Sequence, residues 1–203
     1  MKYAGAVFFD SDGTITDDTT GIILPTEKTL CAVEKLKQNG FLTSLCTGRA
    51  LPYTHHTSKY FDGVITSNGT YGTVGDELVA DFPMDSVLVK DAVDYMNSLG
   101  VIYTLDNPRV CYCSNVTSKV FLSWIGKYSI SASAFSGDAA DFPEKVYKMS
   151  VLFKSAEQAQ EMTGKYKDVL NIDLQPGTLF ADVSQCGFGK GAGVKAFTER
   201  FDI

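Results

Sequence analysis

The first third of the chain alternates short apolar runs with amphipathic segments. Residues 3–9, 41–46 and 63–66 are apolar runs of strand length, and polar residues follow each of them. Between the first two runs, apolar residues recur at helical spacing from Thr26, a residue suited to N-capping, to Gly40. A short helix is expected before the third run. The order strand, helix, strand, helix, strand predicts a parallel sheet with crossover helices.

From about residue 71 the pattern changes to a mixed succession of strands and helices. The predicted elements are a hairpin over 71–82, a helix from Asp85 to Gly100, strands near 101–106 and 110–114, a helix over 117–127, a loop over 129–140, a strand over 145–153, a helix over 155–166, strands near 169–174 and 178–183, and a helix over 192–201. The middle of this segment, about 100 residues, has the size of a second domain. We therefore predict an α/β protein with a Rossmann-like parallel-sheet core, residues 1–81 and 184–203, and an inserted α+β domain, residues 82–183.

Polar residues follow each of the three predicted parallel strands. Asp10 and Asp12 follow the first strand, Thr47 follows the second and Asn68 the third. Residues two apart in a strand point to the same side, so the two aspartates are expected to face one site. Ligands of parallel sheets bind beyond the carboxyl ends of the strands. The pattern favours a functional site there over an aspartate-rich turn that only caps a strand.

A glycine-rich turn opens the last predicted helix. Gly189 and Gly191 flank Lys190 at the point where the helix begins. Backbone amides at a helix N-terminus, together with an ammonium group, make a seat for phosphate. The alternative is a flexible loop with a solvated lysine, and this turn alone leaves both open.

Composition narrows the classes of function. The chain has 203 residues, 44% of them hydrophobic and 21% charged, as in an ordinary globular protein. Its formal net charge of −6 offers no complementarity to nucleic acid or to an anionic membrane surface. No apolar run reaches the roughly 18 residues needed to span a bilayer. We expect a cytoplasmic protein with neither nucleic acid nor membrane as a partner.

The cysteines and histidines do not suggest a metal centre. The five cysteines are odd in number and lack zinc-type spacing, which favours free thiols over disulfides or a metal site. They are Cys31, Cys46, Cys111, Cys113 and Cys186. The only histidines, His55 and His56, are adjacent in a predicted helix and are expected at the surface or next to the site residues rather than as metal ligands.

Four short motifs accompany the predicted strand ends and the last helix. They are Asp10-Ser-Asp12-Gly-Thr14, Thr47-Gly48-Arg49, Ser67-Asn68-Gly69 and Gly189-Lys190-Gly191. In this order, with an insertion between the third and the fourth, they resemble the haloacid dehalogenase (HAD) superfamily, specifically its Cof-type phosphatases. The resemblance covers essentially the whole chain. It implies a HAD-like core domain and makes the insertion a cap domain that determines substrate specificity.

The resemblance also implies a role for each motif residue. Asp10 would attack the substrate phosphorus and form an aspartyl-phosphate, and Asp12 would act first as general acid and then as general base. The phosphate- and substrate-binding residues would be Thr47, Gly48, Arg49, Asn68 and Lys190. A Mg²⁺ ion would be held by Asp10 and the backbone carbonyl of Asp12. A cation is needed because a carboxylate that approaches a phosphate dianion meets more negative charge than one lysine neutralises.

Two features depart from the family's pattern. Ser11 stands where an apolar residue is usual, and its side chain is expected to point away from the site. The family's fourth motif, a Gly-Asp pair followed by a second Asp, supplies further metal ligands and has no counterpart between Lys190 and Ile203. The strand that carries this motif pairs beside the first strand, so residues 6–9 are expected at a sheet edge open to self-association. A truncated copy, a disrupted reading frame and a protein completed by another chain all fit this departure.

The sequence therefore predicts a Mg²⁺-dependent phosphatase of small phosphorylated metabolites such as sugar phosphates. Two alternatives stay open. The first is a phosphomutase or phosphotransferase of the same superfamily, and the second is a catalytically incomplete fragment that binds a phosphorylated ligand. In the insertion, Tyr103, Arg109, Tyr112 and Trp124 are candidates for substrate contact, with core packing as the alternative for each.

Overall fold

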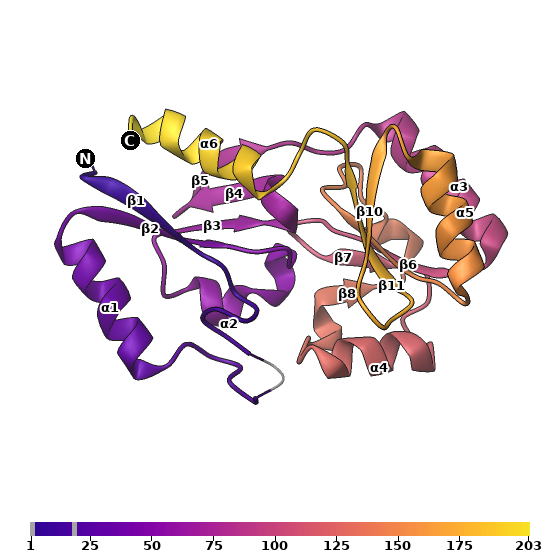
Figure 1. The fold of residues 1–203 in the computed structure, drawn as a ribbon, viewed down its shortest axis with the longest axis horizontal. Coiled ribbons are helices and arrows are strands. Elements are labelled where there is room, and N and C mark those ends of the chain that lie inside the picture. The colour runs from indigo at the N-terminus through magenta and orange to yellow at the C-terminus, as the bar shows by residue number, and fades with distance from the viewer. Residues whose placement is uncertain (1–2, 18–19) are drawn as a thin grey trace. The chain divides into compact units, whose positions relative to one another are not determined.

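The computed structural model describes residues 3–17 and 20–203, which form two compact units. The core unit comprises Met1–Phe82 and Phe188–Ile203, and the inserted unit comprises Pro83–Gly187 (Figure 1). Each unit contains its own sheet and its own hydrophobic core. The mixed α/β fold with two sheets is the predicted class, and that prediction is confirmed.

The sheet of the core unit has five strands in the order of the sequence. They are β1 (Gly5–Phe9), β2 (Phe41–Cys46), β3 (Gly63–Thr66), β4 (Tyr71–Val74) and β5 (Glu77–Asp81). The first three strands are parallel, and β4 and β5 extend the sheet as an antiparallel hairpin. β1 lies at one edge of this sheet, as predicted, and its residues are half-buried.

Helices cover both faces of the core sheet. On one face, Val33 of α1 (Glu27–Gln38) belongs to the same buried cluster as Leu45 of β2. On the other, Phe197 of α6 (Lys190–Phe201) packs with Leu42 and Ile65. Leu42 and Leu45 are three residues apart in one strand and so point to opposite faces. The apolar residues of β2 are therefore covered by helices on both faces.

The sheet of the inserted unit has six strands in the order β10-β11-β9-β6-β7-β8. Their bounds are β6 (Ile102–Leu105), β7 (Cys111–Cys113), β8 (Phe135–Ser136), β9 (Met149–Leu152), β10 (Leu170–Leu174) and β11 (Phe180–Gln185). All pairs are antiparallel except β7 with β8.

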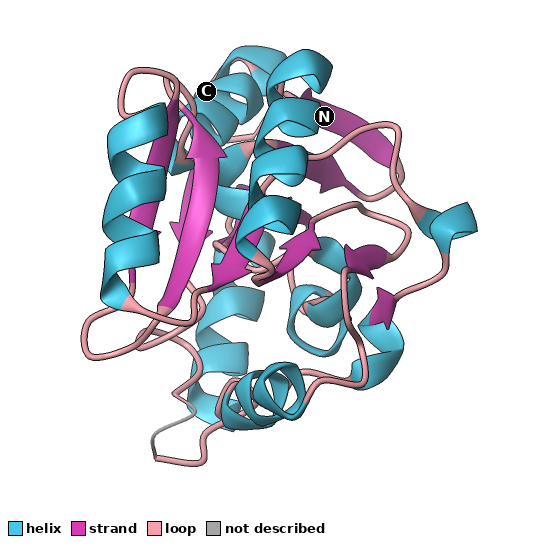
Figure 2. Cartoon of the chain, turned by 90° about the vertical axis from the view of Figure 1, so that its right-hand side faces the viewer, coloured by secondary structure: helices cyan, strands magenta, loops and turns pink. Residues whose placement is uncertain are grey.

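Three longer helices accompany this sheet. α3 (Ser86–Leu99) and α5 (Ala156–Tyr166) bury Met96 and Met162 against one face, where they meet Val151 of β9. Figure 2, which looks onto the right-hand side of Figure 1, shows these two helices in front of the strands. Leu152 follows Val151 in β9 and points to the opposite face, where side chains of α4 (Lys119–Lys127) lie near it.

Two predicted elements of the inserted unit differ from the structure. The predicted loop over 129–140 contains the short helices η3 (Ala132–Ala134) and η4 (Ala139–Asp141) and the strand β8. The strand predicted over 145–153 is only β9. Residues 145–148 include an apolar pair that is buried, but the amide of Tyr147 donates to the carbonyl of Asp106, outside the regular ladder. Burial alone therefore did not make this segment a strand.

Candidate active site

Asp10 and Lys190 meet although 180 positions separate them in the sequence. Asp10 follows the last residue of β1, and Lys190 is the first residue of α6. Lys190 Nζ donates to Asp10 Oδ1 at 2.7 Å, and the amide of Ser11 donates to the same oxygen at 2.8 Å. Their side chains are 39% and 48% exposed, so this ion pair is open to solvent. The structure thus places a carboxylate and an ammonium group together beyond the end of the first strand.

The second aspartate is held by an arginine. Arg49 Nη2 lies 2.6 Å from Asp12 Oδ1, and Arg49 Nε is 3.1 Å from each carboxylate oxygen. The Arg49 side chain is largely buried, at 13% exposed, whereas the Asp12 side chain is 50% exposed. A guanidinium that contacts a carboxylate at two points fixes its orientation as well as its charge. Arg49, predicted to contact substrate, here positions Asp12.

Thr47 and Gly48 lie directly behind the end of β2. Thr47 is 1% exposed, and its hydroxyl accepts a hydrogen bond from the amide of Arg49 at 3.1 Å. The amide of Asn68 donates to the carbonyl of Thr47 at 3.3 Å. A Cβ added to Gly48 would lie 2.7 Å from Asn68 Oδ1, so glycine permits this close approach. Thr47, Gly48 and Asn68 therefore form one packed group.

The turn after β3 is strained and touches the start of α6. Ser67 and Asn68 adopt positive φ values of 49° and 57°, which non-glycine residues adopt rarely. Gly69 follows with φ of +96°, and a Cβ at that position would meet the carbonyl oxygen of Gly189 at 2.2 Å. Only glycine allows the two backbones to approach so closely. This contact joins the Asn68 turn to the helix start that carries Lys190.

Ser11 points away from this group, as expected. It is 4% exposed, and its hydroxyl shares a hydrogen bond of 3.0 Å with the hydroxyl of Thr16. The amides of Thr14, Ile15 and Thr16 all donate to the carbonyl of Ser11. The turn after β1 is therefore organised around the backbone and side chain of Ser11, which leaves the carboxylates on either side partly exposed.

One neighbour of the site was missed by the sequence analysis. Cys46, the last residue of β2, is 5% exposed. Burial raises the pKa of its thiol, the charge of Lys190 lowers it, and the charge of Asp10 raises it. The thiol therefore interacts electrostatically with both Lys190 and Asp10, and its raised pKa keeps it neutral. Its place directly before Thr47 at a strand end is the signal by which it could have been found.

The other sequence candidates are the cysteines, the two histidines and residues of the inserted unit, where the rings of Tyr103 and Tyr112 lie 6.4 Å apart between centroids. All five cysteines are free, and Cys111 and Cys113 are buried, as predicted. His55 and His56 are exposed on the short helix α2 (His55–Ser58). In the inserted unit, Tyr103 is 3% exposed and belongs to the core, whereas Arg109 pairs with Asp141 at 2.8 Å. Core packing therefore holds for Tyr103.

The two aspartates are a partial donor set for Mg²⁺. Within residues 3–17 and 20–203, no three His, Cys, Asp or Glu side chains gather as a metal cluster. Mg²⁺ commonly keeps several waters and takes only one or two carboxylates together with substrate phosphate oxygens. The exposed carboxylate of Asp10 and the adjacent Asp12 fit that mode of binding. Among the described residues, no helix is long and apolar enough to cross a membrane.

Comparisons with known proteins identify the family and the fold. The sequence model of a family described as haloacid dehalogenase-like hydrolase matches residues 7–203. No curated protein matches the chain.

Solved structures with the same fold include three that cover nearly all of this chain. One is described as the HAD subclass IIB sugar phosphatase BT4131: it is 21% identical, has a TM-score of 0.80, and the match covers 98% of this chain and 77% of that one. TM0651 from Thermotoga maritima is 19% identical, with a TM-score of 0.78 and coverage of 98% and 76%. A haloacid dehalogenase-like hydrolase from B. subtilis is 16% identical, with a TM-score of 0.73 and coverage of 100% and 80%.

Proposed function

The chain belongs to the haloacid dehalogenase-like hydrolases, and from this premise we propose that it hydrolyses phosphate monoesters of small metabolites, sugar phosphates among them. The observation that carries the proposal is the pair of cation-bound carboxylates, Asp10 with Lys190 and Asp12 with Arg49, at the carboxyl ends of parallel strands. Both carboxylates remain about half exposed, as groups that react with an incoming substrate need to be.

Asp10 is the proposed nucleophile. One carboxylate oxygen attacks the phosphorus, the new O–P bond forms, and the bond from phosphorus to the leaving alkoxide breaks. The second oxygen, Oδ1, stays hydrogen-bonded to Lys190 and to the amide of Ser11. These two donors fix the direction from which the attacking oxygen approaches. Such positioning of the reacting groups accounts for much of the rate of enzymatic phosphoryl transfer.

Asp12 is the proposed proton carrier. In its acid form it protonates the leaving oxygen, and as a carboxylate it then takes a proton from the water that hydrolyses the aspartyl-phosphate. That second step releases inorganic phosphate and restores Asp10. Arg49 holds the Asp12 carboxylate through both of its oxygens, so the proton is delivered from a fixed position.

The remaining site residues are assigned to the transferring phosphoryl group. The amide of Gly48 and the side chain of Asn68 are donors that lie together behind the end of β2, while Thr47 supports them from a buried position. Lys190 offsets negative charge on both the nucleophile and the phosphoryl oxygens. The family is typically Mg²⁺-dependent, and we assign Asp10 and the backbone carbonyl of Asp12 as ligands. A bound Mg²⁺ would polarise phosphoryl oxygens and reduce charge repulsion.

Two other functions use the same residues. A phosphomutase or phosphotransferase would pass the phosphoryl group of Asp10 to a second hydroxyl instead of to water. A module that only binds a phosphorylated ligand would use the same residues without forming the aspartyl-phosphate. We place the protein in the cytoplasm under each of these functions.

The test is phosphate release from p-nitrophenyl phosphate and a panel of sugar phosphates, with and without Mg²⁺. Asp10→Asn is expected to abolish turnover. The matched control is Asp76→Asn, which neutralises an exposed aspartate in the turn between β4 and β5 and should leave the rate unchanged. Phosphate that appears on an added sugar, with none in solution, favours the transferase. Saturable phosphate binding without any turnover favours the binding module, and turnover that survives Asp10→Asn contradicts the mechanism.

We also propose that a second copy of the chain pairs with the edge strand β1. An edge strand presents backbone groups that another strand can satisfy, and β1 is an edge of the core sheet among the described residues. Sedimentation over a range of concentrations should then show reversible self-association. A monomer at every concentration contradicts this pairing.

A further inference from the structure

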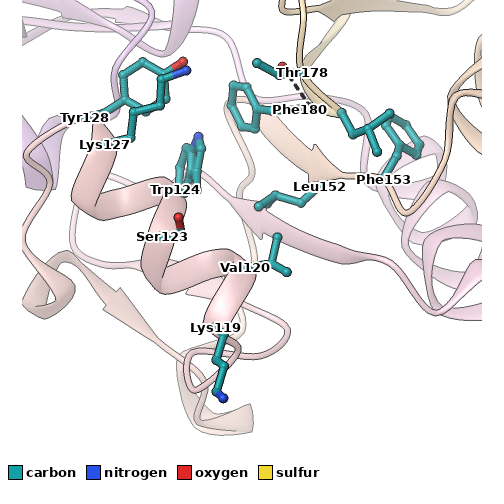
Figure 3. Close-up of a pocket in the computed structure, with 11 residues that line it drawn as sticks. Lys119, Val120, Ser123, Trp124, Lys127, Tyr128, Leu152, Phe153, Thr178 and Phe180 are labelled. Carbon is teal, nitrogen blue, oxygen red and sulfur yellow. Dashed lines mark hydrogen bonds between the residues drawn. The ribbon is translucent and has the colours of Figure 1, made fainter. Parts of the chain in front are cut away.

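A pocket of about 410 Å³ lies in the inserted unit, beside α4 (Figure 3). It is built from one face of α4, the end of β9 and the chain that leads into β11. The residues that line it are Lys119, Val120, Ser123, Trp124, Lys127, Tyr128, Leu152, Phe153, Thr178, Leu179 and Phe180. We call this the α4 pocket. Its volume lies within the roughly 300–1,000 Å³ typical of sites for small molecules.

The wall of the α4 pocket is aromatic, and further aromatic side chains pack against it from the protein interior. The indole of Trp124 stacks on the ring of Phe180, with centroids 5.0 Å apart and planes inclined by 30°. Behind Trp124, the fully buried Phe121 and the edge-on ring of Phe135 keep the indole in place. A flat apolar surface that is already fixed loses little conformational entropy when a ring or an acyl chain packs on it.

Apolar groups at the mouth of the pocket remain in water. Val120 is 58% exposed and Leu179 is 39% exposed. The hydroxyl of Thr178 is turned to its own chain, because it donates to the carbonyl of Gln175 and accepts from the amide of Phe180. The pocket thus offers an occupant mainly apolar surface, whose removal from water is favourable.

The charged residues that line the pocket are all basic. Lys119 and Lys127 stand at the two ends of α4, and none of the eleven lining residues is acidic. Figure 3 shows Lys119 at the lower end of the helix and Lys127 beside Tyr128 at the upper end. In a chain whose formal net charge is −6, this is a local positive field, and it attracts anions.

The indole nitrogen of Trp124 adds an unfilled donor. It is buried and has no hydrogen-bond partner among the described residues. A buried donor without an acceptor is destabilising, so an acceptor that reached this nitrogen would be bound favourably.

We propose that the α4 pocket binds an amphipathic organic anion, with a flat aromatic or acyl body against Trp124 and Phe180 and an acidic group beside Lys119 or Lys127. The proposal does not depend on the chemistry of the core unit, because every lining residue belongs to the inserted unit. It gives this unit a binding function that rests on residues of its own.

The test uses 1-anilinonaphthalene-8-sulfonate, an anionic aromatic probe. Trp124 is the only tryptophan and lines the pocket, so its quenching reports binding and the variants below assign the signal to this pocket. We expect saturable binding of one probe per chain. Val120→Asp, which places a carboxylate at the mouth, should weaken binding at least about tenfold, or ~1.4 kcal/mol. The matched control is Val87→Asp on α3, where the valine is 75% exposed and outside the pocket, and it should bind like the parent.

A second comparison separates the charge from the apolar contact. The uncharged analogue N-phenyl-1-naphthylamine should bind more weakly than the sulfonate, and the double variant Lys119→Glu, Lys127→Glu should remove that difference. Circular dichroism on each variant verifies that the probe does not report unfolding. Equal binding to Val120→Asp and Val87→Asp would contradict binding in the α4 pocket. Equal affinity for the charged and uncharged probes would contradict the proposed role of the acidic group. A dimer that Val120→Asp dissolves also overturns the proposal, because the occupant is then a second copy of the chain.

Discussion

Arg49 determines where the carboxylate of Asp12 points. Its largely buried guanidinium contacts both carboxylate oxygens. We expect Arg49→Ala to lower kcat/KM by roughly a hundredfold, because a misplaced proton carrier loses that order of rate. Arg49→Lys keeps the charge but not the two-point contact and should lie between. Steady-state kinetics with p-nitrophenyl phosphate measures the effect, and full activity of Arg49→Ala contradicts a positioning role.

Lys148 is a buried lysine that pairs with two aspartates of the inserted unit. Its side chain is 2% exposed and lies 3.4 Å from the fully buried carboxylate of Asp106, and it also bonds Asp182. Lys148→Met would leave that carboxylate without this partner, and we expect a loss of about 3 kcal/mol or more in unfolding free energy. Urea denaturation measures it. The control Lys165→Met breaks the exposed pair with Asp91 and should lose no more than about 1 kcal/mol.

Residue types and order predicted which groups gather at the site, but not how they pair. Asp10 and Lys190 converge because strand ends and helix starts share one edge of a parallel sheet. The contact of Arg49 with Asp12 depends on side-chain directions that no local pattern encodes. Cys46, in contrast, could have been predicted, because it directly precedes Thr47 at the end of a buried strand.

Helices are predicted well where their first residues carry a local signal. Thr26, Asp85 and Ser155 each accept a hydrogen bond from an amide of the first turn, and α1, α3 and α5 begin where these residues predict. The segment before β9 has no such signal. Its backbone partner is Asp106, about 40 positions earlier, so its conformation is determined by a long-range contact.

The turn after β3 is in close backbone contact with the start of α6. A Cβ on Gly69 would collide with the backbone carbonyl of Gly189. To relieve the collision, either the turn or the start of α6 would have to move. We expect Gly69→Ala to displace Lys190 and to reduce phosphatase activity at least tenfold. Gly75→Ala is the matched control, because Gly75 also has positive φ but open space around it. Equal activity of the two variants would contradict the claim that this contact positions Lys190.

Each unit of the molecule has a hydrophobic core of its own. Among the described residues, a large cluster of the inserted unit lies between its sheet and α3 and α5, and clusters of the core unit lie on both faces of its sheet. Units with separate cores can unfold separately, and two-state behaviour then fails for the whole chain.

We therefore expect two transitions in differential scanning calorimetry, and single substitutions should assign them. Lys148→Met removes a buried partner in the inserted unit and should lower one transition by roughly 10 °C or more, since 1 kcal/mol shifts a domain of this size by about 4–8 °C. Gly69→Ala should lower only the other, because its collision lies within the core unit. A single transition that both substitutions shift by similar amounts would show that the two cores unfold cooperatively. In that case the inserted unit transmits its stability to the site that contains Asp10, and the two units are not energetically independent.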